Sequence, residues 1–291
     1  RIIERPRATP TVVPVVEYVR GVVTALVTPL TKDGELCADC LRSLVEFQAS
    51  RGVGGLFLAG TYGEGMVLPQ RVRAELYARA SQYAPSGLFL LPHVGAAGAE
   101  SAVSLARASR DLGYGVVSSL GPVYHRPTRR GLVEYFGYLA GRAGVEVVVY
   151  NNRGRQGYNI SPDDFEEIAG GVPQVVGIKD TSYDVDQMLE YRVRFGSRYF
   201  VAGAGDSMLL YTFALGLPAH ICGISNALPE LAVELYRSAS GGDLRRAMEL
   251  QYAVLRVRKA LGRFGVESQT VLREVLRWRG VDPGYPPVAL G

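Results

Sequence analysis

The 291-residue chain is poor in several residue types that carry familiar chemistry. It has three cysteines, three histidines and, read along the sequence, lysine only at Lys32, Lys179 and Lys259. Asparagine is also scarce. Arginine in place of lysine and few amide side chains fit a thermophilic source, although genome composition explains them equally well. In such a chain, each lysine that persists is a candidate functional residue.

No run of 18 apolar residues occurs, which excludes a membrane span of ordinary length. Residues 1–20 contain three prolines and lack the apolar core of a signal peptide, so we interpret them as an N-terminal extension on the surface and expect a cytoplasmic protein. The net charge is +4, but the basic residues are dispersed. Their densest run, Arg126–Arg130, has no interleaved aromatics, so we expect no nucleic-acid partner.

The cysteines allow two interpretations. Cys37-Ala-Asp-Cys40 has the spacing of half a zinc site or of a redox motif. The same two residues share a helical stripe with Leu41, Leu44 and Val45, and we favour the interpretation that both are small core-facing residues. The histidines His93, His125 and His220 are scattered, so no second ligand pair exists and we expect no metal site.

Eight short apolar segments recur about every 30 residues, which is the length of one βα unit. Most lack polar alternation, as a parallel sheet buried on both faces requires. The chain therefore predicts an α/β fold with a parallel sheet. The expected strands are Val22–Thr28, Gly55–Ala59, Leu88–His93, Gly115–Leu120, Val145–Tyr150, Val175–Lys179, Tyr199–Ala202 and Ala219–Ile224.

Helical periodicity fills the intervals between these strands. Cys37–Arg51 and Ala99–Leu112 are examples, the second ended by Gly113, and Ser161-Pro162 begins another helix. No GxGxxG follows the first strand, and eight strands exceed the usual doubly wound sheet. We therefore predict a (β/α)8 TIM barrel with additional C-terminal helices. Residues 21–228 would form the barrel and residues 229–291 a C-terminal helical region.

In such a barrel, functional side chains lie at the C-terminal ends of the strands. Lys179 ends the apolar stretch 175–178, where desolvation lowers an amine pKa and favours attack on a ketone. The alternative is an ion pair with the adjacent Asp180. Tyr150 ends the preceding strand and suits proton transfer. The loop Gly60–Glu64 offers backbone N–H groups to a carboxylate, or is simply a tight turn.

Together these motifs resemble the dihydrodipicolinate synthase / N-acetylneuraminate lyase family, from Gly21 onward. The resemblance depends on several motifs that occur in the family's order. They are Thr24-Ala25-Leu26-Val27-Thr28-Pro29 with Asp33-Gly34, Gly60-Thr61-Tyr62-Gly63-Glu64, Pro122-Val123-Tyr124 with Pro127-Thr128, Tyr150-Asn151, Gly177-Ile178-Lys179-Asp180-Thr181-Ser182, and Gly223-Ile224-Ser225 with Pro229.

The resemblance implies a role for each matching residue. Lys179 would form an imine with pyruvate and Tyr150 would act as general acid and base. Thr61 would link Tyr150 to Tyr124, which in the family reaches across a dimer interface, so that a homo-oligomer, a dimer or tetramer, is implied. The amides of Thr61 and Tyr62 would bind the pyruvate carboxylate. Two further substrate-binding candidates are Arg155, with Arg153 as its competitor, and Ile224.

The predicted function is condensation of pyruvate with an aldehyde such as aspartate semialdehyde, without a metal or organic cofactor, because the imine serves as electron sink. Arg155 favours this substrate, whereas Tyr62, which replaces the family's second threonine, alters the pocket. Alternatives are a 2-keto-3-deoxygluconate-type aldolase, a 2-keto-acid dehydratase and a non-catalytic oxo-acid-binding relative. A phosphate-binding barrel isomerase is a further one, for which Gly203-Ala204-Gly205 is a partial match.

Overall fold

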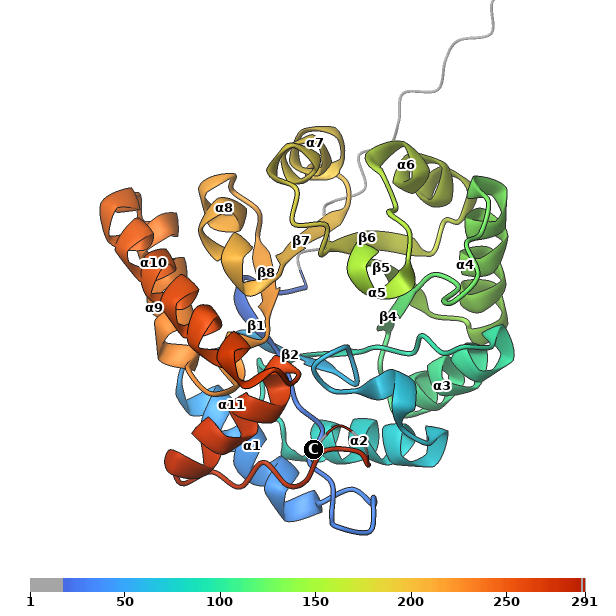
Figure 1. Cartoon of the computed structure of the whole chain (residues 1–291). Helices are drawn as coiled ribbons and strands as arrows, with labels where there is room; N and C mark the ends of the chain where they lie inside the picture. Colours follow the sequence, from blue (N-terminus) through green and yellow to red (C-terminus); the bar gives the residue numbers. More distant parts are fainter. Residues whose placement is uncertain (1–17, 289, 291) are drawn as a thin grey trace, which may run out of the picture.

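The computed structural model describes residues 18–288 and 290. Its eight parallel strands form one sheet in the order β3-β2-β1-β8-β7-β6-β5-β4, curled into the ring seen in Figure 1. A bridge between His93 and Ser118 joins the two outer strands, so the predicted TIM barrel is confirmed. The strands are β1 Gly21–Ala25, β2 Gly55–Leu58, β3 Phe89–Pro92, β4 Val116–Leu120, β5 Glu146–Asn151, β6 Val175–Asp180, β7 Phe200–Ala204 and β8 Ala219–Cys222.

Helices surround the ring because each strand is followed by a segment with one apolar face. The larger core cluster lies between sheet and helices, and a second cluster fills the barrel itself. The helices are α1 Ala38–Ser50, α2 Gln70–Tyr83, α3 Ala99–Asp111, α4 Arg129–Ala143, α5 Arg153–Gln156, α6 Pro162–Gly171, α7 Val185–Phe195, α8 Leu209–Ala214, α9 Pro229–Ser240, α10 Leu244–Leu261 and α11 Ser268–Trp278.

The local signals for helix ends agree with the structure. Ser161 accepts from the Asp164 amide in a capping box at the start of α6. Gly113, just beyond α3, has φ +92°, a conformation that glycine adopts without strain. After β8, α9 packs against β1 and takes the place of the eighth outer helix, while α10 packs against α9, and α11 packs against α10 (Figure 1).

The first described residues cover the N-terminal end of the barrel. Residues 1–17 of the expected extension lie outside the described residues. Tyr18 stacks on Phe89 at 5.8 Å between ring centroids and meets Phe200 edge-on at 5.7 Å. Val19 is 9% exposed. The expected surface location is therefore wrong for Val19, whereas Tyr18 is partly exposed and Arg20 is exposed.

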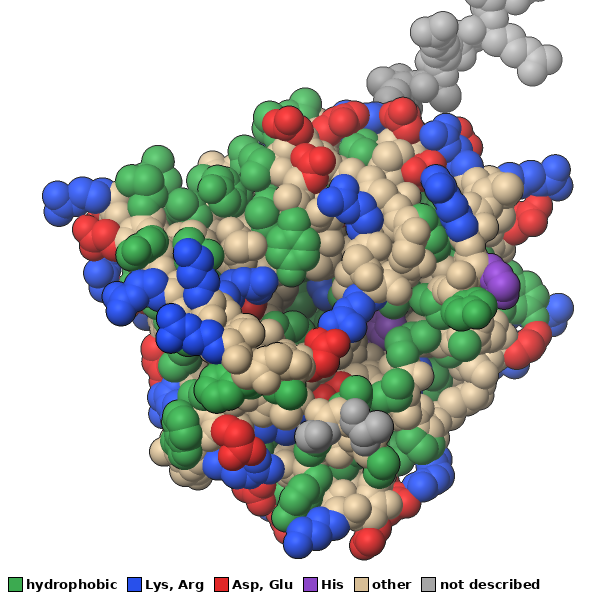
Figure 2. All heavy atoms as spheres, in the orientation of Figure 1, with side chains coloured by type: hydrophobic (Ala, Val, Ile, Leu, Met, Phe, Trp, Pro, Cys, Tyr) green, Lys and Arg blue, Asp and Glu red, His purple; other side chains and the backbone are tan. Residues whose placement is uncertain are grey.

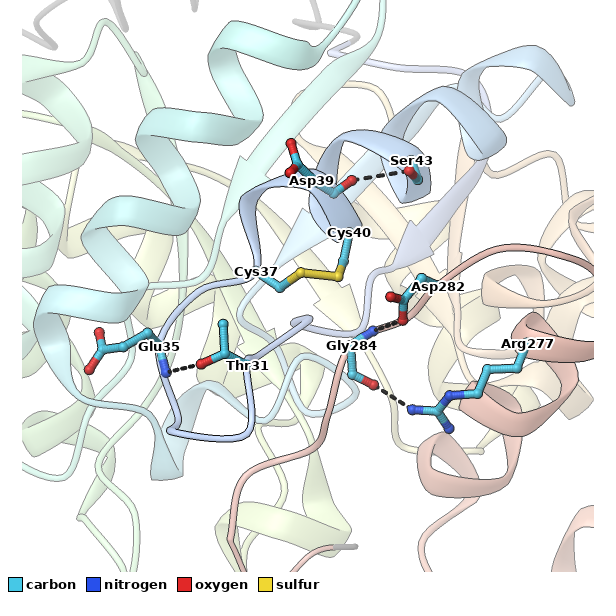
Figure 3. The surroundings of a disulfide bond; sticks show 9 residues. All are labelled: Thr31, Glu35, Cys37, Asp39, Cys40, Ser43, Arg277, Asp282 and Gly284. Carbon is cyan, nitrogen blue, oxygen red and sulfur yellow. Dashed lines mark hydrogen bonds between the residues drawn. A yellow bond between two sulfur atoms is a disulfide. The ribbon is translucent and has the colours of Figure 1, made fainter.

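The cysteine pair differs from our expectation. Cys37 and Cys40 form a disulfide at the start of α1, with Cα atoms 5.3 Å apart (Figure 3). Cys37 is the N-cap of α1 and has extended backbone angles, so it does not lie on the core-facing stripe as Cys40 does. The prediction of two small core-facing cysteines is wrong for Cys37. Cys222 is free and buried.

Two further properties concern the described residues as a group. No helix within residues 18–288 is long and apolar enough to cross a membrane. The same part of the chain contains no group of three or more His, Cys, Asp or Glu side chains that suits a metal ion.

Candidate active site

A cavity of about 280 Å³ opens at the C-terminal ends of the strands. Figure 2 shows it as a hollow at the centre of the face that also carries the C-terminal helices. Its wall combines strand ends with Arg258 of α10 and with the start of α11. The polar lining residues are Thr61, Tyr62, Tyr150, Asn152, Arg155, Lys179, Thr181, Tyr183, Asp206, Arg258, Glu267, Ser268 and Gln269.

Lys179 lies at the floor of this cavity. Its side chain is buried, with Nζ 3.7 Å from the ring centroid of Tyr150 and 4.0 Å from that of Phe57. Burial lowers the pKa of Lys179, and the Tyr150 phenol opposes that change without cancelling it. A larger fraction of neutral amine results, which is the nucleophilic form.

The alternative pairing of Lys179 with Asp180 does not occur among the described residues. Consecutive side chains of a strand point to opposite faces, and Asp180 points away from the cavity. Its carboxylate accepts from Ser182 at 2.6 Å, Asn151 at 2.8 Å and Gln187 at 3.1 Å. The amine of Lys179 therefore faces the cavity without a carboxylate partner from its own strand.

Tyr150 is beside Lys179 because β5 and β6 pair these two residues in register. The phenol oxygen lies 3.1 Å from Thr61 Oγ1 and accepts from Asn152 Nδ2 at 2.8 Å. Burial alone raises the pKa of Tyr150, but the Lys179 charge and hydrogen bonds from Thr61, Lys179 and Asn152 outweigh it and lower this pKa. Both pKa values thus lie below their usual ranges, and the two adjacent groups are placed to exchange a proton.

The loop Gly60–Glu64 is held rigidly beside them. A Cβ on Gly60 would lie 2.3 Å from the Phe57 ring, so no larger residue fits. Glu64 has φ +55° and forms a two-contact ion pair with Arg273 of α11, both side chains being 1% exposed. The amides of Thr61 and Tyr62 belong to this anchored turn.

Two of the predicted substrate-binding side chains line the far wall of the cavity. Arg155 donates to Glu267 at 2.6 Å, which lowers the pKa of Glu267, whereas Arg153 does not line the cavity; both arginines are exposed. The ring of Tyr62 lies against Gly223, where a Cβ would approach it to 2.2 Å. Burial raises the pKa of Tyr62, so its hydroxyl stays protonated.

Ile224 and Tyr124 lie elsewhere. Ile224 is fully buried and does not line the cavity; its N–H, with that of Gly223, donates to Asp206 Oδ1 at 3.0 and 2.8 Å. Tyr124 is 93% exposed with φ +72°, and no hydrogen bond among the described residues joins it to Thr61. It borders a second hollow, of about 420 Å³, which also reaches Thr61.

Several lining residues were not predicted. Arg258 of α10 contacts Asp206 at 3.1 Å, and Tyr183 and Glu267 complete that side of the cavity. Two of these four residues, Arg258 and Glu267, come from the C-terminal helical region. Helical periodicity does not distinguish a charged residue that lines a cavity from one that is simply exposed. Asn152 was within reach of sequence reasoning, because it directly follows the Tyr-Asn pair in an asparagine-poor chain.

Comparison with known proteins places the chain in a family. A model described as "Dihydrodipicolinate synthetase family" matches residues 18–289. The chain is 31% identical over 245 residues to the 4-hydroxy-tetrahydrodipicolinate synthase of Thermotoga sp. (strain RQ2), 83% of each chain being covered. The dihydrodipicolinate synthase of Aquifex aeolicus superposes with a TM-score of 0.79 at 27% identity, covering 90% of this chain and 98% of that one.

A sialic acid aldolase from Ruminococcus gnavus superposes with a TM-score of 0.89, covering 94% of this chain and 91% of that one; its 22% identity shows the shared fold alone. Fold, cavity and sequence thus agree, and the chain belongs to the dihydrodipicolinate synthetase family of class I carbon–carbon lyases.

Proposed function

We propose that this chain condenses pyruvate with an aldehyde that carries a carboxylate, aspartate semialdehyde being the best candidate, as a 4-hydroxy-tetrahydrodipicolinate synthase does. The observation that carries the proposal is the buried Lys179 amine, 3.7 Å from the Tyr150 ring and without a carboxylate partner, in a cavity that also holds Arg155. The names of the relatives at about 30% identity support the same substrate.

In the first half of the proposed reaction, the neutral Lys179 amine adds to the C2 carbonyl of pyruvate. Tyr150 gives a proton to the resulting alkoxide and takes one from the nitrogen, which yields a carbinolamine. Tyr150 then protonates the hydroxyl group, water leaves, and an iminium forms. The Tyr150 phenolate takes a proton from C3 and so gives the enamine, in which the electron pair of the broken C–H bond has moved toward the nitrogen. No metal or organic cofactor takes part.

In the second half, the enamine carbon attacks the aldehyde and forms the new C–C bond. The aldehyde oxygen becomes an alkoxide, which takes its proton from the Tyr150 hydroxyl group. Thr61 contacts the same hydroxyl group. Water then hydrolyses the iminium and releases the amine. The amides of Thr61 and Tyr62 bind the pyruvate carboxylate, and Arg155 binds that of the aldehyde by a charge-assisted contact. Ile224 takes no part in this binding, because it is fully buried outside the cavity and its N–H donates to Asp206.

We further propose a homo-oligomer, built first as a dimer and then as a tetramer, in the cytoplasm. Tyr124 is a large aromatic side chain left almost fully exposed beside a hollow that reaches Thr61. Exposed Met66 and Val67 border the same hollow. An exposed apolar patch of this kind marks a protein interface, and a second copy would bring its own Tyr124 into it. Light scattering tests the assembly, and Tyr124→Ala should weaken both the dimer and turnover.

Borohydride trapping tests the chemistry. Incubation with pyruvate and borohydride should add one reduced pyruvate to Lys179, and Lys179→Ala should abolish both the adduct and turnover. Tyr150→Phe should slow turnover strongly but leave the adduct detectable. Since burial lowers the pKa of Lys179, trapping should reach half its maximal rate below pH 10.4, the ordinary lysine value. Wild-type activity in Lys179→Ala would refute the mechanism.

A panel of aldehydes tests the substrate. Pyruvate with aspartate semialdehyde should turn over faster than pyruvate with glyceraldehyde, the partner of a 2-keto-3-deoxygluconate-type aldolase. The reverse order would leave the imine mechanism in place and replace the substrate. An adduct with pyruvate but no turnover with any aldehyde would indicate a binding protein instead.

A further inference from the structure

The phenol oxygen of Tyr150 has a second polar neighbour besides Thr61. Asn152 Nδ2 donates to Tyr150 Oη at 2.8 Å and lies 3.4 Å from Thr61 Oγ1. Asn152 is 7% exposed and lines the cavity. It occupies the N-cap position of α5, where an asparagine side chain ordinarily accepts from a helix amide. Here the side chain makes no such bond and is directed to Tyr150 instead.

The chemistry of the amide group gives this contact a direction. An amide nitrogen donates hydrogen bonds and accepts none, so the Tyr150 oxygen is the acceptor. The hydroxyl hydrogen of Tyr150 must then point to another acceptor, and Thr61 Oγ1, at 3.1 Å, is the nearest among the described residues. The contact with Asn152 therefore orients the proton that Tyr150 transfers.

Charged and titratable groups also face Tyr150 from the neighbouring elements. Lys179 lies beside it on β6, and the ring of His93 at the end of β3 meets it edge-on at 5.6 Å. Burial lowers the pKa of His93 well below its usual range, so this ring is neutral. Arg155 and Tyr183 act on Tyr150 from across the cavity, and Arg155 is paired with Glu267.

Of these groups, the nearest cation does not keep its charge during the proposed reaction. The Lys179 nitrogen is an amine, an iminium and a neutral enamine in turn. It therefore stabilises a Tyr150 phenolate by its charge at some stages of the reaction and not at others. Asn152 has no titratable group, and its N–H remains a donor at every stage. A fixed donor at this position holds the phenolate when the lysine nitrogen is neutral.

We propose that Asn152 is a positioning residue that holds the Tyr150 oxygen by a constant donated hydrogen bond and so directs the Tyr150 proton toward Thr61 and the reacting atoms. This inference rests on the proposed function, since it assigns Asn152 a role in the proton transfers of that reaction.

The test compares pH profiles of kcat/KM for pyruvate. The relevant limb is the one that Tyr150→Phe abolishes. Asn152→Leu keeps the size of the side chain but removes the donor, so the phenolate loses a hydrogen bond and the midpoint of this limb should rise by roughly one to two pH units. Asn152→Asp is nearly isosteric and places a negative charge there, so the midpoint should rise further.

A matched control separates orientation from general loss of structure. Asn159 donates to Gln187 at 2.7 Å and accepts from Asn151 at 2.8 Å, away from the cavity. Asn159→Leu should lower the thermal midpoint of unfolding and leave the pH midpoint in place. Borohydride trapping of pyruvate should persist in all three variants.

The order of midpoints, wild type below Asn152→Leu below Asn152→Asp, would support the inference, because a packing defect alone would not produce it. If the Asn152 variants still form the borohydride-trapped pyruvate adduct but the midpoint of their pH profile equals that of the wild type, this inference is overturned and the proposed function stands. Absence of trapping in the wild type would overturn both. If Asn152→Leu does not fold, Asn152→Asp decides alone.

Discussion

The buried ion pair between Glu64 and Arg273 links the C-terminal helical region to the loop that holds pyruvate in the proposed reaction. The Arg273 guanidinium contacts both Glu64 oxygens, at 2.8 and 2.7 Å, and its Nη2 also donates to the Thr28 carbonyl at 2.9 Å. Both side chains are 1% exposed. We expect Arg273→Met to remove the cation and leave a carboxylate buried without its partner.

The expected cost follows from that uncompensated charge. Removing one member of a buried pair destabilises a protein by about 3–5 kcal/mol, most of it the cost of the remaining buried charge. The double variant Glu64→Gln/Arg273→Met carries neither charge. It should therefore be more stable than Arg273→Met alone, by about 1–3 kcal/mol, the cost of leaving a buried hydrogen-bonding group without its partner.

Urea denaturation at one fixed protein concentration measures these differences, and borohydride trapping reports on the loop. Arg130→Met is the matched control, because Arg130 pairs with Glu134 on the surface at side-chain exposures of 88% and 63%. It should cost no more than about 0.5 kcal/mol. The reasoning would be refuted if the double variant were no more stable than Arg273→Met. It would also be refuted if Arg273→Met lost as little free energy of unfolding as the Arg130→Met control.

Three further outcomes are expected. Thiol titration in denaturant should find one thiol before reduction and three after it, and reducing the four-residue Cys37–Cys40 loop should lower the free energy of unfolding by about 2 kcal/mol. Arg155→Met should raise KM for a carboxylate-bearing aldehyde roughly tenfold to hundredfold but leave KM for an uncharged aldehyde unchanged. Glu267→Gln should lower KM for the carboxylate-bearing aldehyde, because Glu267 then no longer competes with that carboxylate for Arg155. If this KM is unchanged in both variants, Arg155 is excluded as the aldehyde-binding cation.

The barrel and the centre of the site were predictable because their signals are local. Apolar strands at regular spacing require a parallel sheet covered by helices, and closing the sheet brings every strand end to one mouth. Lys179 and Tyr150 each end such a strand, so their proximity follows from topology together with the register of β5 and β6. The glycines on either side of Thr61 indicate a tight turn, and this inference does not require knowing which residues pack against the turn.

Other features required the tertiary structure. Whether Cys37 meets Cys40 depends on the backbone angles of one N-cap residue, which a helical stripe does not reveal. That Arg273 meets Glu64, 209 positions apart, depends on where α11 packs over the barrel. Helix periodicity shows which face of α11 is buried but not what that face contacts. The sequence alone thus determined the ring and the position of Lys179 at its mouth, whereas long-range packing decided which side chains anchor, orient and enclose the proposed site.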